Sequence, residues 1–163
     1  MKSTNATAPS IPSLEREIVL TRVFDAPRSL VFAAWTDPKH VANWWGPKGF
    51  TNPVCEMDVR VGGAIRIVMR GPDGVDYPMS GIFREIVVPE KLVVTCIPED
   101  AAGNPLFEVL TTATFLESKG KTTLTLTARA VKAPAAAAPM LAGMETGWSQ
   151  SLDRLGAEVA GMA

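Results

Sequence analysis

The fold depends most on residues 140–160, which read MLAGMETGWSQSLDRLGAEVA. The apolar side chains of this stretch recur every three or four residues, the spacing of one face of an α-helix, at Met144, Trp148, Leu152, Leu155 and Val159. At about 1.5 Å per residue this helix is on the order of 30 Å long. A helix of that length needs a large apolar partner for its stripe.

The partner is a β-sheet, because residues 50 to 131 read almost entirely as strand. Six segments rich in β-branched and apolar residues are predicted strands: 50–59, 64–70, 76–88, 91–97, 106–117 and 121–131. Short connections such as GPDG at 71–74 favour antiparallel neighbours. Gly62, Gly63 and Gly81 are expected to allow bends or bulges, which a strongly curved sheet needs.

One more strand and two short helices precede these segments. Residues 17–24, EIVLTRVF, predict a strand. The DAP sequence at 25–27 predicts the start of one helix, with Asp25 as its N-cap, and Asp37-Pro38 predicts a second that ends near Trp44. We therefore expect a single α+β domain over 15–163, after a flexible tail at 1–14. An alanine- and proline-rich linker at 133–139 is expected to join the sheet to the last helix.

The composition limits the classes of function. Of 163 residues, 47% are hydrophobic and 20% are charged, and 16 Lys and Arg against 17 Asp and Glu give a net charge of −1. This balance argues against nucleic-acid binding, which needs a clustered excess of basic side chains. No apolar run approaches the roughly 20 residues of a membrane span, and the polar start is not a secretory signal. We expect a soluble, cytoplasmic protein, either a monomer or a homodimer.

Side chains with reactive groups are scarce. The chain has one histidine, two cysteines and one tyrosine, too few and too widely spaced for a catalytic triad or a zinc site. Cys55 and Cys96 fall on different predicted strands, which favours buried free thiols over a disulfide. We predict no catalytic residue, no metal and no cofactor, and we favour a protein that is not an enzyme.

Several segments resemble one protein family. They are similar, in order along the chain, to segments of the branch of the START-like (SRPBCC, Bet v-like) superfamily named after the activator of the heat-shock-protein-90 ATPase. The segments are TRVFDAPR at 21–28, VFAAWTDP at 31–38, WWGP at 44–47, DVRVGG at 58–63, MRGPDG at 69–74 and GMETGWSQSLDRL at 143–155. The resemblance extends over about residues 15 to 160.

The resemblance implies a helix-grip fold, in which a curved antiparallel sheet of six or seven strands wraps around a long C-terminal helix. Relatives mostly hold a hydrophobic ligand between sheet and helix, as carriers or sensors, and less often act as cyclase- or hydrolase-like enzymes. The eukaryotic activator carries an additional N-terminal domain that engages the chaperone, where this chain has about fifteen residues. This difference argues against chaperone activation, whereas a contact with a chaperone or regulator, and a role in the stress response, remain open.

The candidate ligand-binding residues are aromatic and methionine side chains expected along the seam between helix and sheet. They are Trp44, Trp45, Phe50, Met57, Met69, Tyr77, Met79, Phe83, Phe107 and Trp148. Aromatic rings offer apolar area, some with a polar edge, and methionines adapt to irregular ligands. The alternative is core packing for the tryptophans and methionines, and solvent exposure at a strand end for Tyr77.

Three function classes follow from these observations. The first is binding of a small apolar or amphipathic ligand, and the second is a co-chaperone-like or regulatory contact with another protein. The third is an enzyme, which needs an ionisable group inside the cavity. The candidates for that group are charged side chains of the strands, and a solvated outer face is the favoured interpretation of them: Glu56, Asp58, Arg66 and Glu85.

Overall fold

The computed structural model describes residues 17–162, so the tail expected at 1–14 lies outside the described residues. Seven strands form one antiparallel sheet: β1 (Glu17–Phe24), β2 (Thr51–Met57), β3 (Ala64–Arg70), β4 (Asp76–Val87), β5 (Lys91–Pro98), β6 (Glu108–Ser118) and β7 (Lys121–Lys132). The helical elements are α2 (Arg28–Thr36), α3 (Pro38–Trp44), a 3-10 turn η1 (Ala135–Ala137), α4 (Ala138–Ala142) and α5 (Met144–Met162). The predicted α+β helix-grip fold is confirmed.

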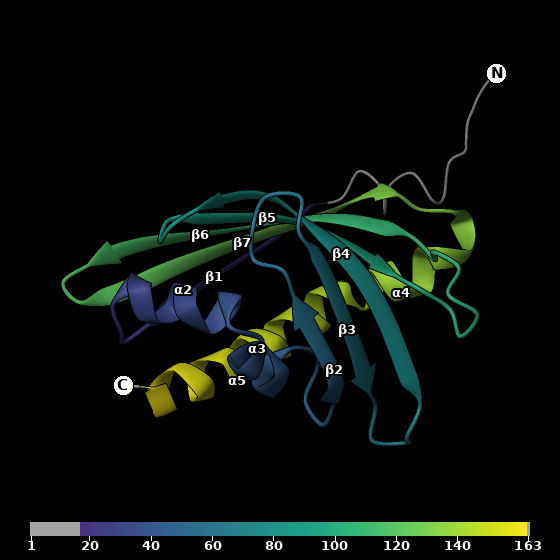
Figure 1. Cartoon of the computed structure of the whole chain (residues 1–163), viewed down its shortest axis with the longest axis horizontal. Helices are drawn as coiled ribbons and strands as arrows, with labels where there is room; N and C mark the ends of the chain where they lie inside the picture. Colours follow the sequence, from purple (N-terminus) through teal and green to yellow (C-terminus); the bar gives the residue numbers. More distant parts are fainter. Residues whose placement is uncertain (1–16, 163) are drawn as a thin grey trace.

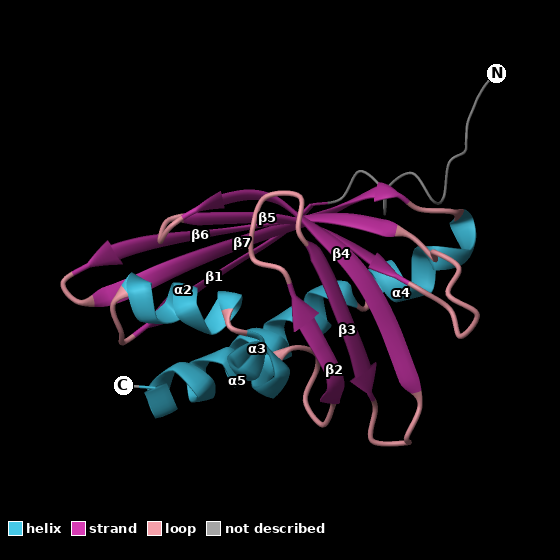
Figure 2. Cartoon of the chain, in the orientation of Figure 1, coloured by secondary structure: helices cyan, strands magenta, loops and turns pink. Residues whose placement is uncertain are grey.

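The strand order is β1-β7-β6-β5-β4-β3-β2. Strands β2 to β7 form a meander of antiparallel neighbours, and β1 adds to the far edge by pairing with β7, for example Leu20 opposite Leu126. The strands fan out over α5, and α2 and α3 lie beside its C-terminal half (Figure 1). The helices thus cover the concave side of the sheet, and α4 lies near the N-terminal end of α5 (Figure 2).

Glycines permit the curvature of the sheet at two adjoining places. A Cβ atom on Gly81 would lie 2.6 Å from the carbonyl oxygen of Thr95, so only glycine lets β4 approach β5 this closely. Gly62 adopts φ +84°, a left-handed conformation that favours glycine, and its N–H donates to the carbonyl oxygen of Phe83 at 2.8 Å. The pairing register of β4 with β5 then shifts between Phe83 and Glu85, as expected of a bulge.

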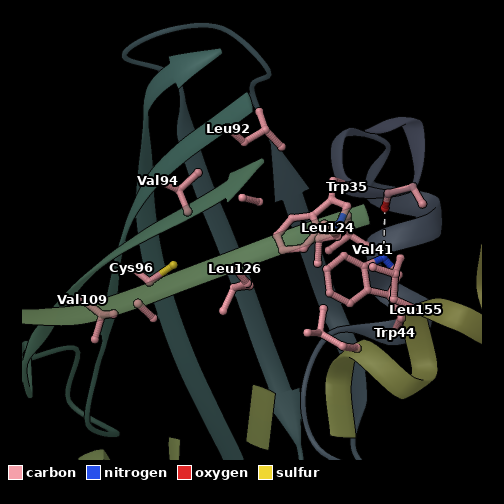
Figure 3. Close-up of a cluster of buried hydrophobic side chains, with 14 of the residues drawn as sticks. Trp35, Val41, Trp44, Leu92, Val94, Cys96, Val109, Leu124, Leu126 and Leu155 are labelled. Atoms are coloured by element: carbon pink, nitrogen blue, oxygen red, sulfur yellow. Dashed lines mark hydrogen bonds between the residues drawn. The ribbon is translucent and has the colours of Figure 1, made fainter. Parts of the chain in front are cut away.

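The core lies between the concave face of the sheet and the helices. Alternate residues of β7, including Leu124 and Leu126, lie in the same core cluster as Leu152 and Leu155 of the α5 stripe, and all four side chains are at most 1% exposed. Burying a leucine contributes about 1.5–3 kcal/mol relative to leaving it exposed. Figure 3 shows part of this core, where Trp44 Nε1 donates to the carbonyl oxygen of Ala34 at 2.9 Å.

The boundaries of three helical segments differ from the prediction. The C-terminal helix begins at Met144 rather than Met140, because α4 ends at its C-cap Gly143 and a new helix starts there. Residues 133–139 contain η1 and the start of α4, so they are not simply a linker. Pro27, not Asp25, is the N-cap residue of α2, and it makes no side-chain cap bond. For α3 the predicted cap is confirmed, since the Asp37 side chain accepts from the Lys39 N–H at 3.0 Å.

Two further predictions from the sequence concern the state of the cysteines and the presence of membrane-spanning helices. Cys55 and Cys96 are both free thiols, as the sequence favoured, but only Cys96 is fully buried and Cys55 is half-buried. Within residues 17–162, none of the helices combines the length and the apolar character that crossing a bilayer requires.

Candidate ligand-binding groove

A groove of about 360 Å³ lies where α4 and the N-terminal half of α5 face the concave side of the sheet. Its volume falls within the roughly 300–1,000 Å³ typical of small-molecule sites. The walls come from the α3–β2 loop, strands β3 to β6, and the two helices. The lining residues are Trp45, Gly46, Pro47, Met69, Met79, Cys96, Pro98, Phe107, Val109, Thr111, Pro139, Met140, Gly143, Met144, Gly147, Trp148 and Ser151.

A void of about 20 Å³ lies deeper in the core and shares four wall residues with the groove: Trp45, Met79, Cys96 and Thr111. Its other walls are apolar side chains of β2 to β6 and of α2 and α3, including Trp35, Met57, Ile67 and Phe83. A space of this size holds a single water molecule or one small group of a ligand. The void and the groove therefore adjoin at these four side chains.

All four tryptophans of the chain form one cluster beside the groove. The rings of Trp35 and Trp148 stack with centroids 6.0 Å apart and planes at 15°, and Trp45 meets Trp148 edge-on at 5.2 Å. Trp44 packs against Trp35 at 4.8 Å on the core side. Contacts between aromatic rings in these geometries are favourable, so the cluster gives the groove a fixed aromatic wall.

Helix α5 also positions the loop that forms the opposite wall. The hydroxyl of Ser151 donates to the carbonyl oxygen of Trp44 at 3.0 Å and accepts from the Gly46 N–H at 3.2 Å. Gly46 adopts φ +95°, and a Cβ atom there would lie 2.7 Å from Met69 Sδ. The loop therefore requires glycine at this position, both for its backbone conformation and for the close approach of Met69.

The groove is almost free of ionisable side chains. Among its described lining residues only Cys96 titrates, and burial raises the pKa of this thiol to about 12, against a smaller opposing effect from the Thr111 hydroxyl beside it. Burial likewise raises the pKa of Cys55, outside the groove, to about 11. The walls of the groove are therefore neutral over the physiological pH range.

The structure brings seven of the ten predicted site residues to this cavity. Trp45, Met69, Met79, Phe107 and Trp148 line the groove. Met57 and Phe83 line the inner void.

The other three predicted site residues lie elsewhere. Trp44 is fully buried behind Trp45 and belongs to the core. Phe50 and Tyr77 pack against each other with ring centroids 5.8 Å apart, and Tyr77 is 44% exposed. Tyr77 shares a strand face with Met79, as expected from alternation, but it lies near the start of β4, beyond the groove wall.

The charged candidates for enzyme chemistry do not line the groove. Asp58 and Glu85 are exposed and pair with neighbouring cations, Asp58 with Arg60 at 2.7 Å. Arg66 Nη1 binds Glu99 Oε1 at 2.6 Å, a hydrogen bond that lowers the pKa of the Glu99 carboxyl. Over residues 17–162, His, Cys, Asp and Glu side chains form no group of three or more that could hold a metal ion.

Sequence reasoning missed several of the lining residues. Alternation from Phe107 places Val109 and Thr111 on the same face of β6, so that signal was present in the sequence. Pro139 and Met140 were missed because their segment reads as a linker before it folds into α4.

A curved antiparallel sheet closed around one long helix, with an apolar groove between them, defines a helix-grip protein of the START-like class. The chain belongs to the family described as Activator of Hsp90 ATPase homolog 1-like protein, which matches residues 25–160. The resemblance seen in the sequence is thus confirmed.

Solved structures support the same assignment. A protein from Chromobacterium violaceum is 32% identical, with a TM-score of 0.77 over 88% of this chain and 96% of that one. A protein described as AHSA1 from Silicibacter pomeroyi is 26% identical, with a TM-score of 0.77 over 91% of this chain and 100% of that one. A protein from Arthrobacter aurescens shares the fold, with 24% identity and a TM-score of 0.79 over 95% and 91% of the two chains. No curated protein matches the chain.

Proposed function

We propose that the groove binds a small, largely apolar or amphipathic molecule and that the protein acts as a carrier or sensor without a catalytic site. The observation that carries this proposal is the groove itself, about 360 Å³ bounded by tryptophan, methionine, proline and phenylalanine side chains. Core packing alone does not require such a space, because protein interiors are normally close-packed.

The composition of the walls suits an apolar ligand. Met69, Met79, Met140 and Met144 are flexible and polarisable, and they adapt to ligands of different outline. Trp148 and Trp45 offer rigid rings for stacking. Affinity would come mainly from apolar area, at about 25 cal/mol per Å² buried, reduced by the cost of association.

Titration with N-phenyl-1-naphthylamine, a neutral probe that fluoresces in apolar surroundings, tests this function. We expect saturable binding of one probe per chain, together with quenching of tryptophan fluorescence, because Trp45 and Trp148 line the groove. Absence of saturable binding at concentrations up to the solubility limit of the probe would contradict the proposal.

A contact with a chaperone or regulator is the second candidate, because one apolar surface is exposed on the convex face. Val23 and Leu116 are 63% and 68% exposed, and both pair with Thr123 of the intervening strand β7. Exposed apolar patches often mark protein contacts. The ATPase rate of a purified heat-shock-protein-90 chaperone, measured with wild-type protein and with Leu116→Ser, tests this alternative. An equal rate with and without the wild-type protein would count against it.

The enzyme alternative has the least support, since among the lining residues that the structure describes the one titratable side chain is a thiol whose pKa is about 12. We further propose a cytoplasmic location. Free thiols such as Cys55 and Cys96 persist in a reducing compartment.

A further inference from the structure

We propose that the ligand of the groove carries one neutral hydrogen-bonding group, which it directs to the hydroxyl of Thr111 at the inner end. The ligand class is then a hydrocarbon body with a single hydroxyl or carbonyl group, such as a phenol, an alcohol or a ketone. This inference rests on the proposed function and specifies the chemistry of the molecule bound.

Thr111 lies where such a group would arrive. The buried residues of β6 alternate along the strand, and Thr111, 2% exposed, takes its place between Val109 and Ala113 on the concave face. It lines both the groove and the inner void, so it marks the junction of the two spaces.

The Thr111 hydroxyl has unused hydrogen-bonding capacity. Its Oγ1 atom is buried and has no hydrogen-bond partner of ordinary geometry among the described residues. The neighbouring Cys96 thiol is a weak donor and a weak acceptor, so it is a poor substitute for an oxygen partner. Folded proteins rarely leave a buried hydroxyl unpaired, and such a group at the wall of a cavity points to a partner supplied from outside the chain.

Two other side chains with polar groups line these spaces, Ser151 in the groove and Trp35 in the inner void. The Ser151 hydroxyl is already satisfied, because it donates to Trp44 and accepts from Gly46. The indole N–H of Trp35, whose ring lines the inner void, is buried without a partner like Thr111 Oγ1.

The polar group of the ligand must be neutral. An ionised group at this depth would lose its hydration and would need an opposite charge nearby. The described lining residues include no Asp, Glu, Lys, Arg or His. Arg154 of α5 already donates to four backbone carbonyl groups, those of Asn43, Trp45, Gly46 and Pro47.

Three probes of nearly equal shape test the inference by equilibrium dialysis: 2-naphthol, 2-methylnaphthalene and 2-naphthoate. We expect wild-type protein to bind 2-naphthol roughly three- to tenfold more tightly than 2-methylnaphthalene, the range expected for one neutral hydrogen bond. Binding of 2-naphthoate should be the weakest of the three.

Two variants make the assignment specific. Thr111→Val keeps the shape of the side chain but removes the hydroxyl, so it should bring the affinity for 2-naphthol down to that for 2-methylnaphthalene. Thr111→Ser keeps the hydroxyl and should retain the preference for 2-naphthol. Affinity for 2-methylnaphthalene should change little in either variant.

The outcomes separate this inference from the proposed function. If both neutral probes bind wild-type protein equally and Thr111→Val changes neither affinity, the inference is overturned while the groove remains a binding site. A resident water that satisfies Thr111 would give this result. If none of the probes binds, both the inference and the proposed function fail.

Discussion

The guanidinium group of Arg154 donates a hydrogen bond to the carbonyl oxygen of Trp45, with an Nη1–O distance of 3.1 Å. The same nitrogen lies 3.0 Å from the carbonyl oxygens of Gly46 and Pro47, and Nη2 lies 3.0 Å from that of Asn43. These carbonyls belong to the end of α3 and the loop after it, where helical partners are missing. Desolvation lowers the pKa of Arg154 from its usual value. One side chain of α5 thus fixes the loop that forms a wall of the groove.

Replacing Arg154 by lysine should destabilise the protein by about 2 kcal/mol, as expected when hydrogen bonds from a charged donor are lost. Lysine carries the same charge, but a single ammonium group cannot reach four carbonyl oxygens as the planar guanidinium does. Urea unfolding measures the change in free energy of unfolding. Arg60→Lys is the control, because Arg60 is exposed and pairs with a near neighbour in the chain, Asp58, at 2.7 Å. Equal stability of Arg154→Lys and wild-type protein would show that charge alone is sufficient.

A bulky side chain at Gly147 should close the groove. Gly147 lines the groove, and a Cβ atom there would lie at an ordinary contact distance, 3.7 Å, from Pro47 Cγ. In Gly147→Phe the ring must therefore extend into the cavity, and we expect the affinity for N-phenyl-1-naphthylamine to fall by about tenfold or more, the equivalent of about 1.4 kcal/mol.

The matched control for this variant lies on the same helix. Gly161→Phe introduces the same residue where nothing lies within 4 Å, outside the groove. Both variants gain helix propensity over glycine, so both should remain folded by circular dichroism. An unchanged probe affinity in Gly147→Phe, or an equal loss in the two variants, would contradict the location of the site.

The sequence predicted the strands well because their signals are local. The predicted strand at 64–70 coincides with β3, and that at 121–131 differs from β7 by one residue. Alternation and turn residues determine such segments without reference to the rest of the chain. The start of α5 was placed four residues early because the apolar spacing continues through Met140, whereas Gly143 ends one helix and begins another.

The site was harder to predict because it depends on which part of the sheet the helices cover. Alternation placed Tyr77 and Met79 on one face, yet only Met79 lies under the groove. Alternation along β6 likewise predicts that Thr111 lies on the concave face of the sheet. That its hydroxyl lacks a partner follows from the tertiary packing around it, which no local pattern in the sequence contains.

The stability of the protein should decrease in alkaline solution in part because of Cys96. Its pKa is about 12 in the folded chain, against 9.0 as the ordinary value. Below pH 9 the thiol is protonated in both states, but above pH 9 the unfolded chain loses the proton that the folded chain retains. The unfolded state is then favoured, and the contribution of the thiol falls by about 2 kcal/mol between pH 8 and pH 10.5.

Urea unfolding of wild-type protein and Cys96→Ala at a series of pH values isolates this effect. Because alanine does not titrate, the difference in free energy of unfolding between the two proteins should shrink as the pH rises above 9. A constant difference from pH 8 to pH 10.5 would show that the thiol titrates alike in both states, contrary to the burial of Cys96.

Replacing Thr111 by valine should stabilise the ligand-free protein. The hydroxyl is buried with only the weakly hydrogen-bonding Cys96 thiol beside it, and valine fills nearly the same volume without a polar atom to desolvate. We expect a gain of about 1 kcal/mol in the free energy of unfolding, which corresponds to a rise of about 2–4 °C in Tm for a chain of this size.

Thr111→Ser, measured beside it by calorimetry, keeps the hydroxyl and loses a buried methyl group, so it should be less stable than wild-type protein. If Thr111→Val instead lowers Tm, the hydroxyl is already satisfied in the empty groove, and the argument that it needs a partner from a ligand loses its physical basis. A gain in stability together with a loss of preference for 2-naphthol would show that the fold tolerates an unpaired hydroxyl at Thr111 because a ligand uses it.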